Sequence, residues 1–102
     1  MNPTKNGVIN NFVPTEFYLS QNCPNPFKEK TTIKYCVAYK TRIRITIFNS
    51  EDEMVERLID EVKESGTYEI EFSVSSHLSR GIYPYCLEAG NYSKRKEMVL
   101  QR

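Results

Sequence analysis

Several features that mark enzymes, metal proteins and membrane proteins are missing from this sequence. The 102 residues include one histidine, and the three cysteines form no Cys-x-x-Cys pair of the kind that binds zinc. There is no Gly-x-Ser-x-Gly elbow for a serine nucleophile and no EF-hand ladder for calcium. No apolar run approaches the length of a transmembrane helix. We therefore expect no enzymatic activity, no cofactor, no metal site and no insertion into a membrane.

The chain also lacks an excess of charge of either sign. Its formal net charge is +1 at pH 7, so no overall field favours binding to nucleic acid or to a membrane surface. The charges are unevenly placed, however. Acidic residues crowd positions 51–71, where only Arg57 and Lys63 are basic, whereas the end of the chain is basic. The basic residues there are Lys94, Arg95, Lys96 and Arg102.

The length suits one domain preceded by a short tail. A chain of this size buries roughly 60–65% of its unfolded surface and can fold alone. Residues 1–15 are polar, contain Pro3, Gly7 and Pro14, and show no periodicity, which indicates a flexible linker or tail. The first twelve residues also lack the apolar region of a signal peptide. We place the folded domain at residues 16–102.

Alternating apolar and polar residues predict a series of short strands. The clearest runs are 31–37, 42–48, 67–74, 81–88 and 92–101, and residues 89–91 have the composition of a hairpin turn. Short strands with turns about every 8–12 residues are typical of an all-β sandwich. The side chains expected in the core are Ile33, Tyr35, Val37, Ile43, Ile45, Ile47, Tyr68, Ile70, Phe72, Tyr83, Tyr85, Leu87, Met98 and Leu100. Those expected to face solvent include Arg42, Arg44, Thr46, Glu69 and Glu71.

One segment has a different period. Its apolar residues are Met54, Val55, Leu58, Ile59 and Val62, at the spacing of an amphipathic helix. The neighbouring strands and the short connections favour an extended, kinked segment instead. The residues alone leave both structures open.

The most distinctive part of the sequence is 17–27, Phe-Tyr-Leu-Ser-Gln-Asn-Cys-Pro-Asn-Pro-Phe. It begins as a strand with Phe17 and Leu19 on one face. Pro24 and Pro26 then fix the backbone and cannot donate to a sheet ladder, so the strand must end there. The result is a stiff corner, and we expect Phe27 to anchor it in the core.

Several motifs, taken together, resemble a known family. They are Phe17-x-Leu19-x-Gln21-Asn22-x-Pro24-Asn25-Pro26-Phe27, Thr31-x-Ile33-x-Tyr35, Gly66-x-Tyr68, Leu78-Ser79-x-Gly81-Ile82-Tyr83-x-Tyr85-x-Leu87-x-Ala89-Gly90 and Lys94-x-Lys96-x-Met98-Val99-Leu100-x-Arg102. In order and spacing they resemble the type A C-terminal sorting domain of type IX secretion. This sequence differs at Cys23, where the family usually has tyrosine, and at Asp52, where it has a turn glycine. It also differs at Pro84, which interrupts a strand and predicts an edge or a bulge there.

The resemblance implies a fold, a function and a location. The family has an Ig-like antiparallel β-sandwich of about seven strands, and the Ig-like domain of flagellar hook-capping proteins is similar. Such a domain follows a covalently linked cargo domain, is read by an outer-membrane translocon and is usually removed by a sortase-like peptidase. The cargo then crosses the periplasm and outer membrane of a Gram-negative bacterium and is secreted or held at the cell surface. The resemblance also favours an extended structure for residues 54–62.

The same resemblance selects the candidate recognition residues. They are Lys94, Lys96, Met98, Val99, Leu100 and Arg102 in the C-terminal strand. The other residues taken from the family motifs are Asn22, Pro24, Asn25, Pro26, Phe27, Gly81, Tyr83 and Gly90. We expect Met98 and Leu100 to pack and the lysines and Arg102 to be outward or terminal charges. An exposed last strand at a sheet edge is where a receptor most easily adds a strand, and lysines there hinder aggregation through the edge.

The cysteines and the histidine are expected to be structural. Cys36 and Cys86 lie on the strands that an Ig disulfide joins, but their phase places them outward on opposite sheets, so we expect no disulfide. His77 lies in a polar loop, where a catalytic role would need a nucleophile and an orienting partner. The acids of 51–71 are interpreted as a solvated charged face.

Two further features bear on the function. Asn91-Tyr92-Ser93 fits a glycosylation sequon, but it also fits a turn followed by a strand. Tyr18, Tyr39 and Tyr92 are candidates for stacking on sugars, as in sandwich domains that bind carbohydrate. The alternative function is therefore a structural or carbohydrate-binding Ig-like module of a surface or extracellular protein.

Overall fold

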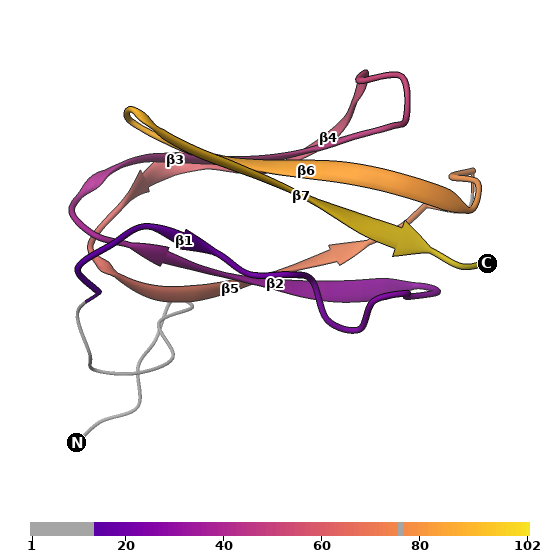
Figure 1. The fold of residues 1–102 in the computed structure, drawn as a ribbon, viewed down its shortest axis with the longest axis horizontal. Coiled ribbons are helices and arrows are strands. Elements are labelled where there is room, and N and C mark those ends of the chain that lie inside the picture. The colour runs from indigo at the N-terminus through magenta and orange to yellow at the C-terminus, as the bar shows by residue number, and fades with distance from the viewer. Residues whose placement is uncertain (1–13, 76) are drawn as a thin grey trace.

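The computed structural model describes residues 14–75 and 77–102, and no helix occurs among them. The strands are β1 (Tyr18–Leu19), β2 (Lys30–Val37), β3 (Thr41–Phe48), β4 (Met54–Lys63), β5 (Gly66–Ser73), β6 (Gly81–Ala89) and β7 (Tyr92–Leu100). They form two antiparallel sheets, with the orders β1-β2-β5 and β4-β3-β6-β7 (Figure 1). This arrangement confirms the predicted Ig-like sandwich. The predicted tail, residues 1–15, lies almost entirely outside the described residues.

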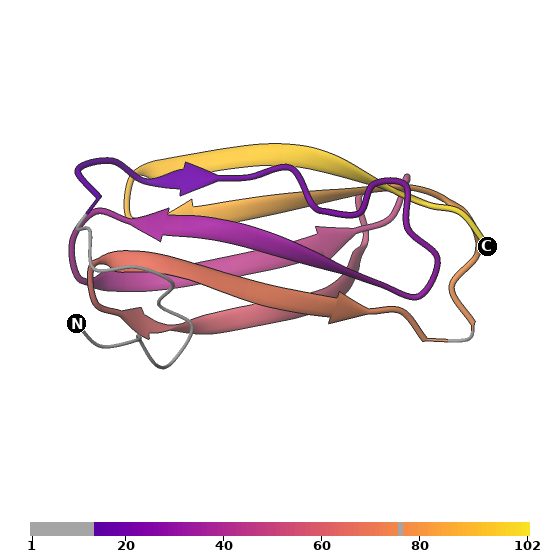
Figure 2. The same cartoon turned by 90° about the horizontal axis from the view of Figure 1, so that it is seen from below.

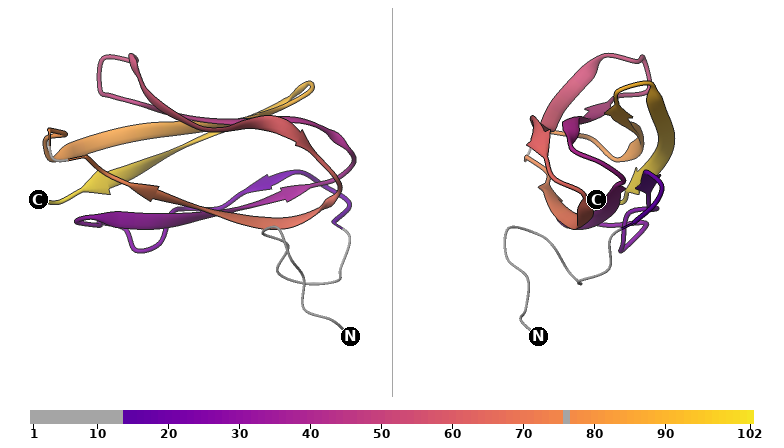
Figure 3. Two further views of the ribbon diagram at one scale, coloured as in Figure 1. Left: turned by 180° about the vertical axis from the view of Figure 1, so that it is seen from behind. Right: turned by 90° about the vertical axis from the view of Figure 1, so that its left-hand side faces the viewer.

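The core lies between the two layers, which the end-on view of Figure 3 shows clearly. The alternating strands bury the predicted faces, and Tyr35, Ile45, Phe72 and Tyr83 are all buried. Ile70 is only half-buried, although it packs against the core. The predicted solvent-facing residues Arg44, Glu69 and Glu71 are exposed.

Thr46 takes the outward face, as predicted, but the expectation that it faces solvent is wrong. This side chain lies on the outer face of the four-stranded sheet, yet it is only 2% exposed. The reason is Arg57 of β4, whose Nε donates a hydrogen bond of 3.2 Å to the Thr46 hydroxyl. A long side chain on the neighbouring strand thus covers a small one, which the alternation within one strand cannot reveal.

The ambiguous segment is a strand, as the resemblance favoured, and its helix-like spacing has a simple cause. The ladder between β3 and β4 shifts its register twice, between Ile45 and Thr46 and again between Ile47 and Phe48. At these shifts Leu58 and Val55 of β4 have no partner on β3. Each extra residue is a bulge that changes which face the following side chains take. The two bulges therefore convert an alternating pattern into one that resembles a helical period.

The turns use residues that tolerate a left-handed backbone. Gly90 has φ +61 in the two-residue turn between β6 and β7, as predicted for a hairpin there. Asp52 has φ +64 between β3 and β4, at the position where the resemblance expects glycine. Aspartate is one of the few other residues that accept this conformation. The Asn49 side chain supports the turn, since its oxygen accepts the amides of Glu51 and Glu53 at 2.9 Å each.

Pro84 lies where one ladder has ended, in agreement with the predicted edge. β6 is bordered by β3 and β7, but its pairing with β3 ends at Tyr85, so residues 81–84 pair with β7 alone. Pro84 is opposite Glu97. The Glu97 carbonyl points away from β6, because it accepts a hydrogen bond from the Gln21 side chain on the other side of β7. Pro84 and Glu97 are therefore a pair of opposite residues that exchange no backbone hydrogen bonds. The missing N–H of Pro84 therefore removes no bond from the sheet.

The cysteines occupy opposite layers. Cys36 lies on β2 and Cys86 on β6, and both alternate with buried neighbours, so their side chains take the outer faces. All three cysteines are free thiols in the structure. Among the described residues there is no helical segment with the length and apolarity needed to cross a bilayer.

Candidate recognition site

The candidate recognition residues lie on β7, an outer strand of the four-stranded sheet. Figure 2 places β7 at the border of the molecule, and Figures 1 and 2 show the C-terminus at the same end as the loop that follows β1. Met98 and Leu100 are fully buried, as predicted, and Val99 is half-buried on the opposite face. The end of β7 is thus part of the core.

The segment 21–27, called the proline loop below, crosses from one sheet to the other. The strand β1 pairs with β2, and Cys23 still forms a bridge with Thr32. Phe27 then pairs in parallel with the end of β7: its amide donates to the Val99 carbonyl at 2.9 Å, and its carbonyl accepts the Gln101 amide at 2.7 Å. The Phe27 ring is 2% exposed and packs edge-on against Phe72. The predicted anchor is confirmed.

Two side chains of the proline loop extend this contact. Asn25 Oδ1 accepts the amide of Val99 at 2.9 Å. Gln21 Nε2 donates to the carbonyl of Glu97 at 2.6 Å. Together with Phe27, they occupy the outward backbone groups at the end of β7, which would otherwise be a free sheet edge.

A buried hydrogen-bond network fixes the proline loop. The Asn22 amide donates to the Tyr85 hydroxyl at 2.9 Å, and that hydroxyl donates to the Ser20 carbonyl at 2.6 Å. The Asn22 side chain donates to the Thr31 hydroxyl at 3.0 Å and to the Pro24 carbonyl at 3.1 Å. Burial raises the pKa of Tyr85 to about 12. Both peptide bonds that precede the prolines of the loop are cis. The hydrogen bonds of Tyr85, Asn22 and Thr31 hold the loop in one shape.

The Arg102 side chain is held in place by hydrogen bonds. Its guanidinium donates to the carbonyl of Ser75 at 2.7 Å and to that of Leu78 at 2.8 Å. Both acceptors belong to the connection between β5 and β6. Arg102 thus ties the last residue of the chain to that connection, so a substitution there would change more than the surface charge.

The outward direction predicted for Lys94 and Lys96 is wrong, although Lys94 is an exposed charge as expected. They pair with Leu87 and Tyr85 of β6, and so share the face of β7 that carries Met98 and Leu100. Lys94 is nevertheless exposed and Lys96 half-buried, because β1, the strand opposite them, has only two residues. No ion pair reaches either lysine from the described residues.

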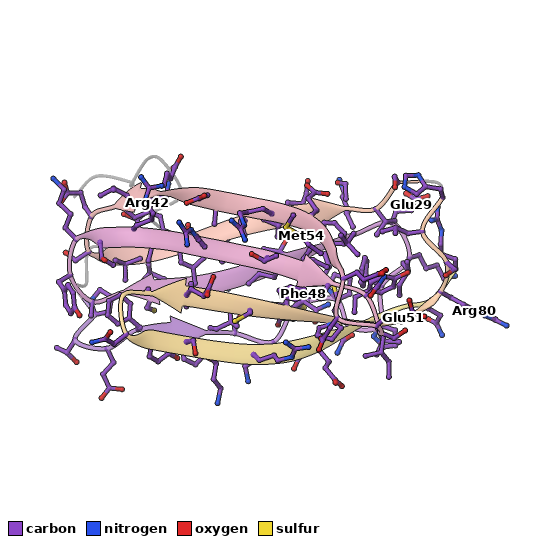
Figure 4. The ribbon with its side chains drawn as sticks, turned by 90° about the horizontal axis from the view of Figure 1, so that it is seen from above. Glu29, Arg42, Phe48, Glu51, Met54 and Arg80 are labelled. Atoms are coloured by element: carbon purple, nitrogen blue, oxygen red, sulfur yellow. The ribbon has the colours of Figure 1, made fainter. Side chains whose placement is uncertain are left out.

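Arg95 is the basic residue of β7 that lies on the outer face of the sheet. It forms an ion pair with Asp52 and lies 5.4 Å from the centre of the Phe48 ring. Figure 4, which looks onto this face, shows Phe48 at the end of β3 beside the loop that carries Glu51, with Arg42 at the other end of β3. The charge of Arg95 is thus partly neutralised, whereas the two lysines keep theirs.

The remaining motif residues are structural. Gly81 begins β6, and the Tyr83 hydroxyl donates to the Ser79 carbonyl at 2.6 Å. His77 is exposed in the connection before β6. On the outer face, hydrogen bonds from Arg42 and Arg44 hold the pKa of Asp60 below its ordinary value. Within the described ranges, no group of three or more histidine, cysteine or acidic side chains is placed to hold a metal ion.

The aromatic residues near β1 contact one another. Phe17 packs edge-on against Tyr39 at 5.0 Å and stacks on Tyr92 at 5.5 Å between ring centres. Tyr92 is half-buried in this cluster, whereas Tyr39 is 62% exposed. Tyr18 is 54% exposed and makes no such pair among the described residues.

Comparison with known families shows which family the chain belongs to. Residues 23–101 match the family described as the secretion system C-terminal sorting domain, which acts in type IX secretion. The chain belongs to this family. No curated protein matches the chain, and neither does any solved structure. Membership implies that the sorting domain serves type IX secretion of an N-terminal cargo, which reaches the cell surface or is secreted.

Sequence reasoning missed two residues of the site. Gln21 was noted only as part of a motif and Tyr85 only as a motif and core residue, yet Gln21 closes the edge of β7 and Tyr85 fixes the proline loop. Tyr85 carried a signal, since a tyrosine predicted in the core needs a partner for its hydroxyl. Gln21 carried none, because its partner is a backbone carbonyl 76 positions away.

Proposed function

We propose that the sorting domain is a non-enzymatic address module that an outer-membrane translocon reads. One observation carries this proposal: two motifs of the family far apart in sequence, the proline loop and the end of β7, form one hydrogen-bonded surface. Phe27, Asn25 and Gln21 supply the contacts from one side, and Glu97, Val99 and Gln101 supply them from the other. A receptor that reads this surface would read the folded domain.

The proposal includes the partners and the route. The cargo is attached on the N-terminal side of the folded domain, and residues 1–15 connect the two. A sortase-like peptidase separates the cargo from the sorting domain after passage through the periplasm and the outer membrane of a Gram-negative bacterium. The recognised element is residues 92–102, with Lys94 and Lys96 as its free charges.

Export of a reporter tests the function. The reporter carries a signal peptide at its start and this domain at its end, in a host with the type IX system. We expect export with the native domain and a clear loss with Lys94→Glu/Lys96→Glu. Arg102 is left unchanged because of its bonds to Ser75 and Leu78.

A matched variant separates position from charge. Lys28→Glu/Arg80→Glu makes the same change of net charge at two exposed positions outside β7. At the exposed positions 28, 80 and 94 such changes usually alter stability by no more than about 0.5 kcal/mol each. Lys96 is half-buried, so melting curves check that both variants fold. Equal export of the two folded variants would contradict the role of the lysines. Failure of the native domain to export the reporter would contradict the function and favour a structural or carbohydrate-binding module.

A further inference from the structure

The free edge of β7 is closed over only half of its length. In an antiparallel pair, alternate residues turn both backbone groups toward the partner or away from it. Val99 turns away from β6, since its amide and carbonyl bond Asn25 and Phe27. By the same alternation, Ser93 and Arg95 also turn their amides and carbonyls away from β6. No hydrogen bond from the described residues reaches those groups.

The reason for the open half is the crossing of the proline loop. Residues 18–19 are paired with β2 in the other sheet, and the chain joins β7 only at Phe27. The position beside residues 93–95 in the four-stranded sheet is therefore left without a strand. In Figure 2, β7 forms the upper border of the molecule, with β1 beside it in the other layer.

On the face of β7 that carries Lys94 and Lys96, the charges beside this open half are positive. Lys94 and Lys96 have no ionic partner among the described residues, and they flank the free groups of Arg95. An isolated edge of this kind resists pairing with a second copy of itself, because lysines would face lysines. It accepts a strand whose side chains carry negative charge.

We propose that residues 93–95 of β7 are a site of strand addition for an extended, acidic segment of the secretion receptor. The segment pairs with the backbone of Ser93 and Arg95, its acids meet Lys94 and Lys96, and the proline loop stops the added strand before Glu97. This inference rests on the proposed function and specifies how the same strand is read. Recognition through the backbone explains how a receptor binds a sheet edge with few distinctive side chains.

A single proline tests the backbone contact. Arg95→Pro removes an N–H that faces away from β6, which an edge strand tolerates, whereas the side chain is lost equally in Arg95→Ala. In the reporter assay we expect Arg95→Ala to export at nearly the native level and Arg95→Pro at least about tenfold less, equivalent to about 1.4 kcal/mol of binding. Equal export by the two folded variants would overturn the proposal. Export of the native domain in the same experiment keeps this outcome distinct from a failure of the proposed function.

A second measurement needs no variant. Amide hydrogen exchange of the 102-residue chain compares the outward amides of one strand. We expect Val99 and Gln101, bonded to the proline loop, to exchange at least about a hundredfold more slowly than Ser93 and Arg95. If Ser93 and Arg95 are protected as strongly as Val99, the edge is closed and strand addition at this site is excluded. If Arg95→Pro does not fold, Ser93→Pro against Ser93→Ala makes the same comparison.

Discussion

The strands β4 and β7 border the same sheet, but their free edges are protected in different ways. β4 contains two bulges and many charged side chains, and Met54 and Val62 are 60% and 50% exposed. β7 pairs with β6 without a register shift and buries Met98 and Leu100. Its outward groups are bonded to the proline loop at one end and left open at the other.

The difference shows that each way of protecting a sheet edge has a cost of its own. Bulges twist an edge so that it no longer matches another strand, but they also disturb the burial of side chains along it. Cover from a distant segment keeps the strand regular and buried, but it leaves an open stretch where the cover ends. A regular, half-covered edge suits recognition, whereas a bulged edge suits solubility.

The largest expected contrast is between one buried residue of β7 and one exposed residue of β4. Leu100→Ala removes a side chain that is 1% exposed and packs beside Phe27, so we expect a loss of about 2–5 kcal/mol. Val62→Ala should change stability by no more than about 0.5 kcal/mol. Urea unfolding measures both values. Similar losses would mean that β4 contributes to the core as much as β7 does.

Alkaline pH should weaken the region of the proline loop. Burial raises the pKa of Tyr85 from 10.0 to about 12, so the folded state favours the neutral phenol. This contribution is fully present below pH 10 and is lost as the pH rises through 12. Complete ionisation would remove about 2–3 kcal/mol. Unfolding measured from pH 8 to 12 checks this, and Tyr85→Phe should lose this part of the dependence while it keeps the part due to Tyr35, whose pKa burial raises further.

At neutral pH, Tyr85→Phe tests the network itself. The change keeps the ring and removes the hydroxyl that bonds the Asn22 amide and the Ser20 carbonyl. Leaving buried polar groups without a partner costs about 1–3 kcal/mol. We expect the amides of Val99 and Gln101 to exchange faster, because the loop that covers them is loosened. Unchanged exchange at both amides would show that Tyr85 does not hold the loop.

The smallest effect concerns a single bond to β7. Asn25→Ala removes the acceptor of the Val99 amide and should cost about 0.5–1.5 kcal/mol. The Val99 amide should exchange faster, while Gln101 stays protected by the Phe27 carbonyl. Asn25→Asp keeps an acceptor and serves as the control. Equal acceleration at both amides would indicate that the whole loop, and not one bond, had been released.

Much of the fold was predictable because most strands follow a strict alternation. Tyr35, Ile45 and Phe72 were placed in the core from their own strands alone. The prediction failed where a second strand intervened, as for Thr46 beneath Arg57. For β4, periodicity suggested a helix, because a bulge is a relation between two strands, and within β4 alone the two bulges give a spacing that resembles a helical period.

The candidate site was predictable only in part. The family motifs pointed to the proline loop and to the end of the chain, and Phe27 and Leu100 were expected to be buried. Neither motif by itself indicated that the proline loop and the end of β7 form one surface. Lys94 and Lys96 share the face of Met98 and Leu100, and their exposure there depended on the length of β1, a strand of the other sheet.

The sequence by itself determined which residues alternate, where prolines end a strand and where Gly90 permits a tight turn, because these are properties of a short stretch of backbone. The tertiary structure decided which edges are open, which charges are free and which carbonyls Arg102 reaches. Those features are set by the neighbour that lies across a sheet or a layer. That neighbour is distant in sequence, and only the packing of the two sheets brings it into contact.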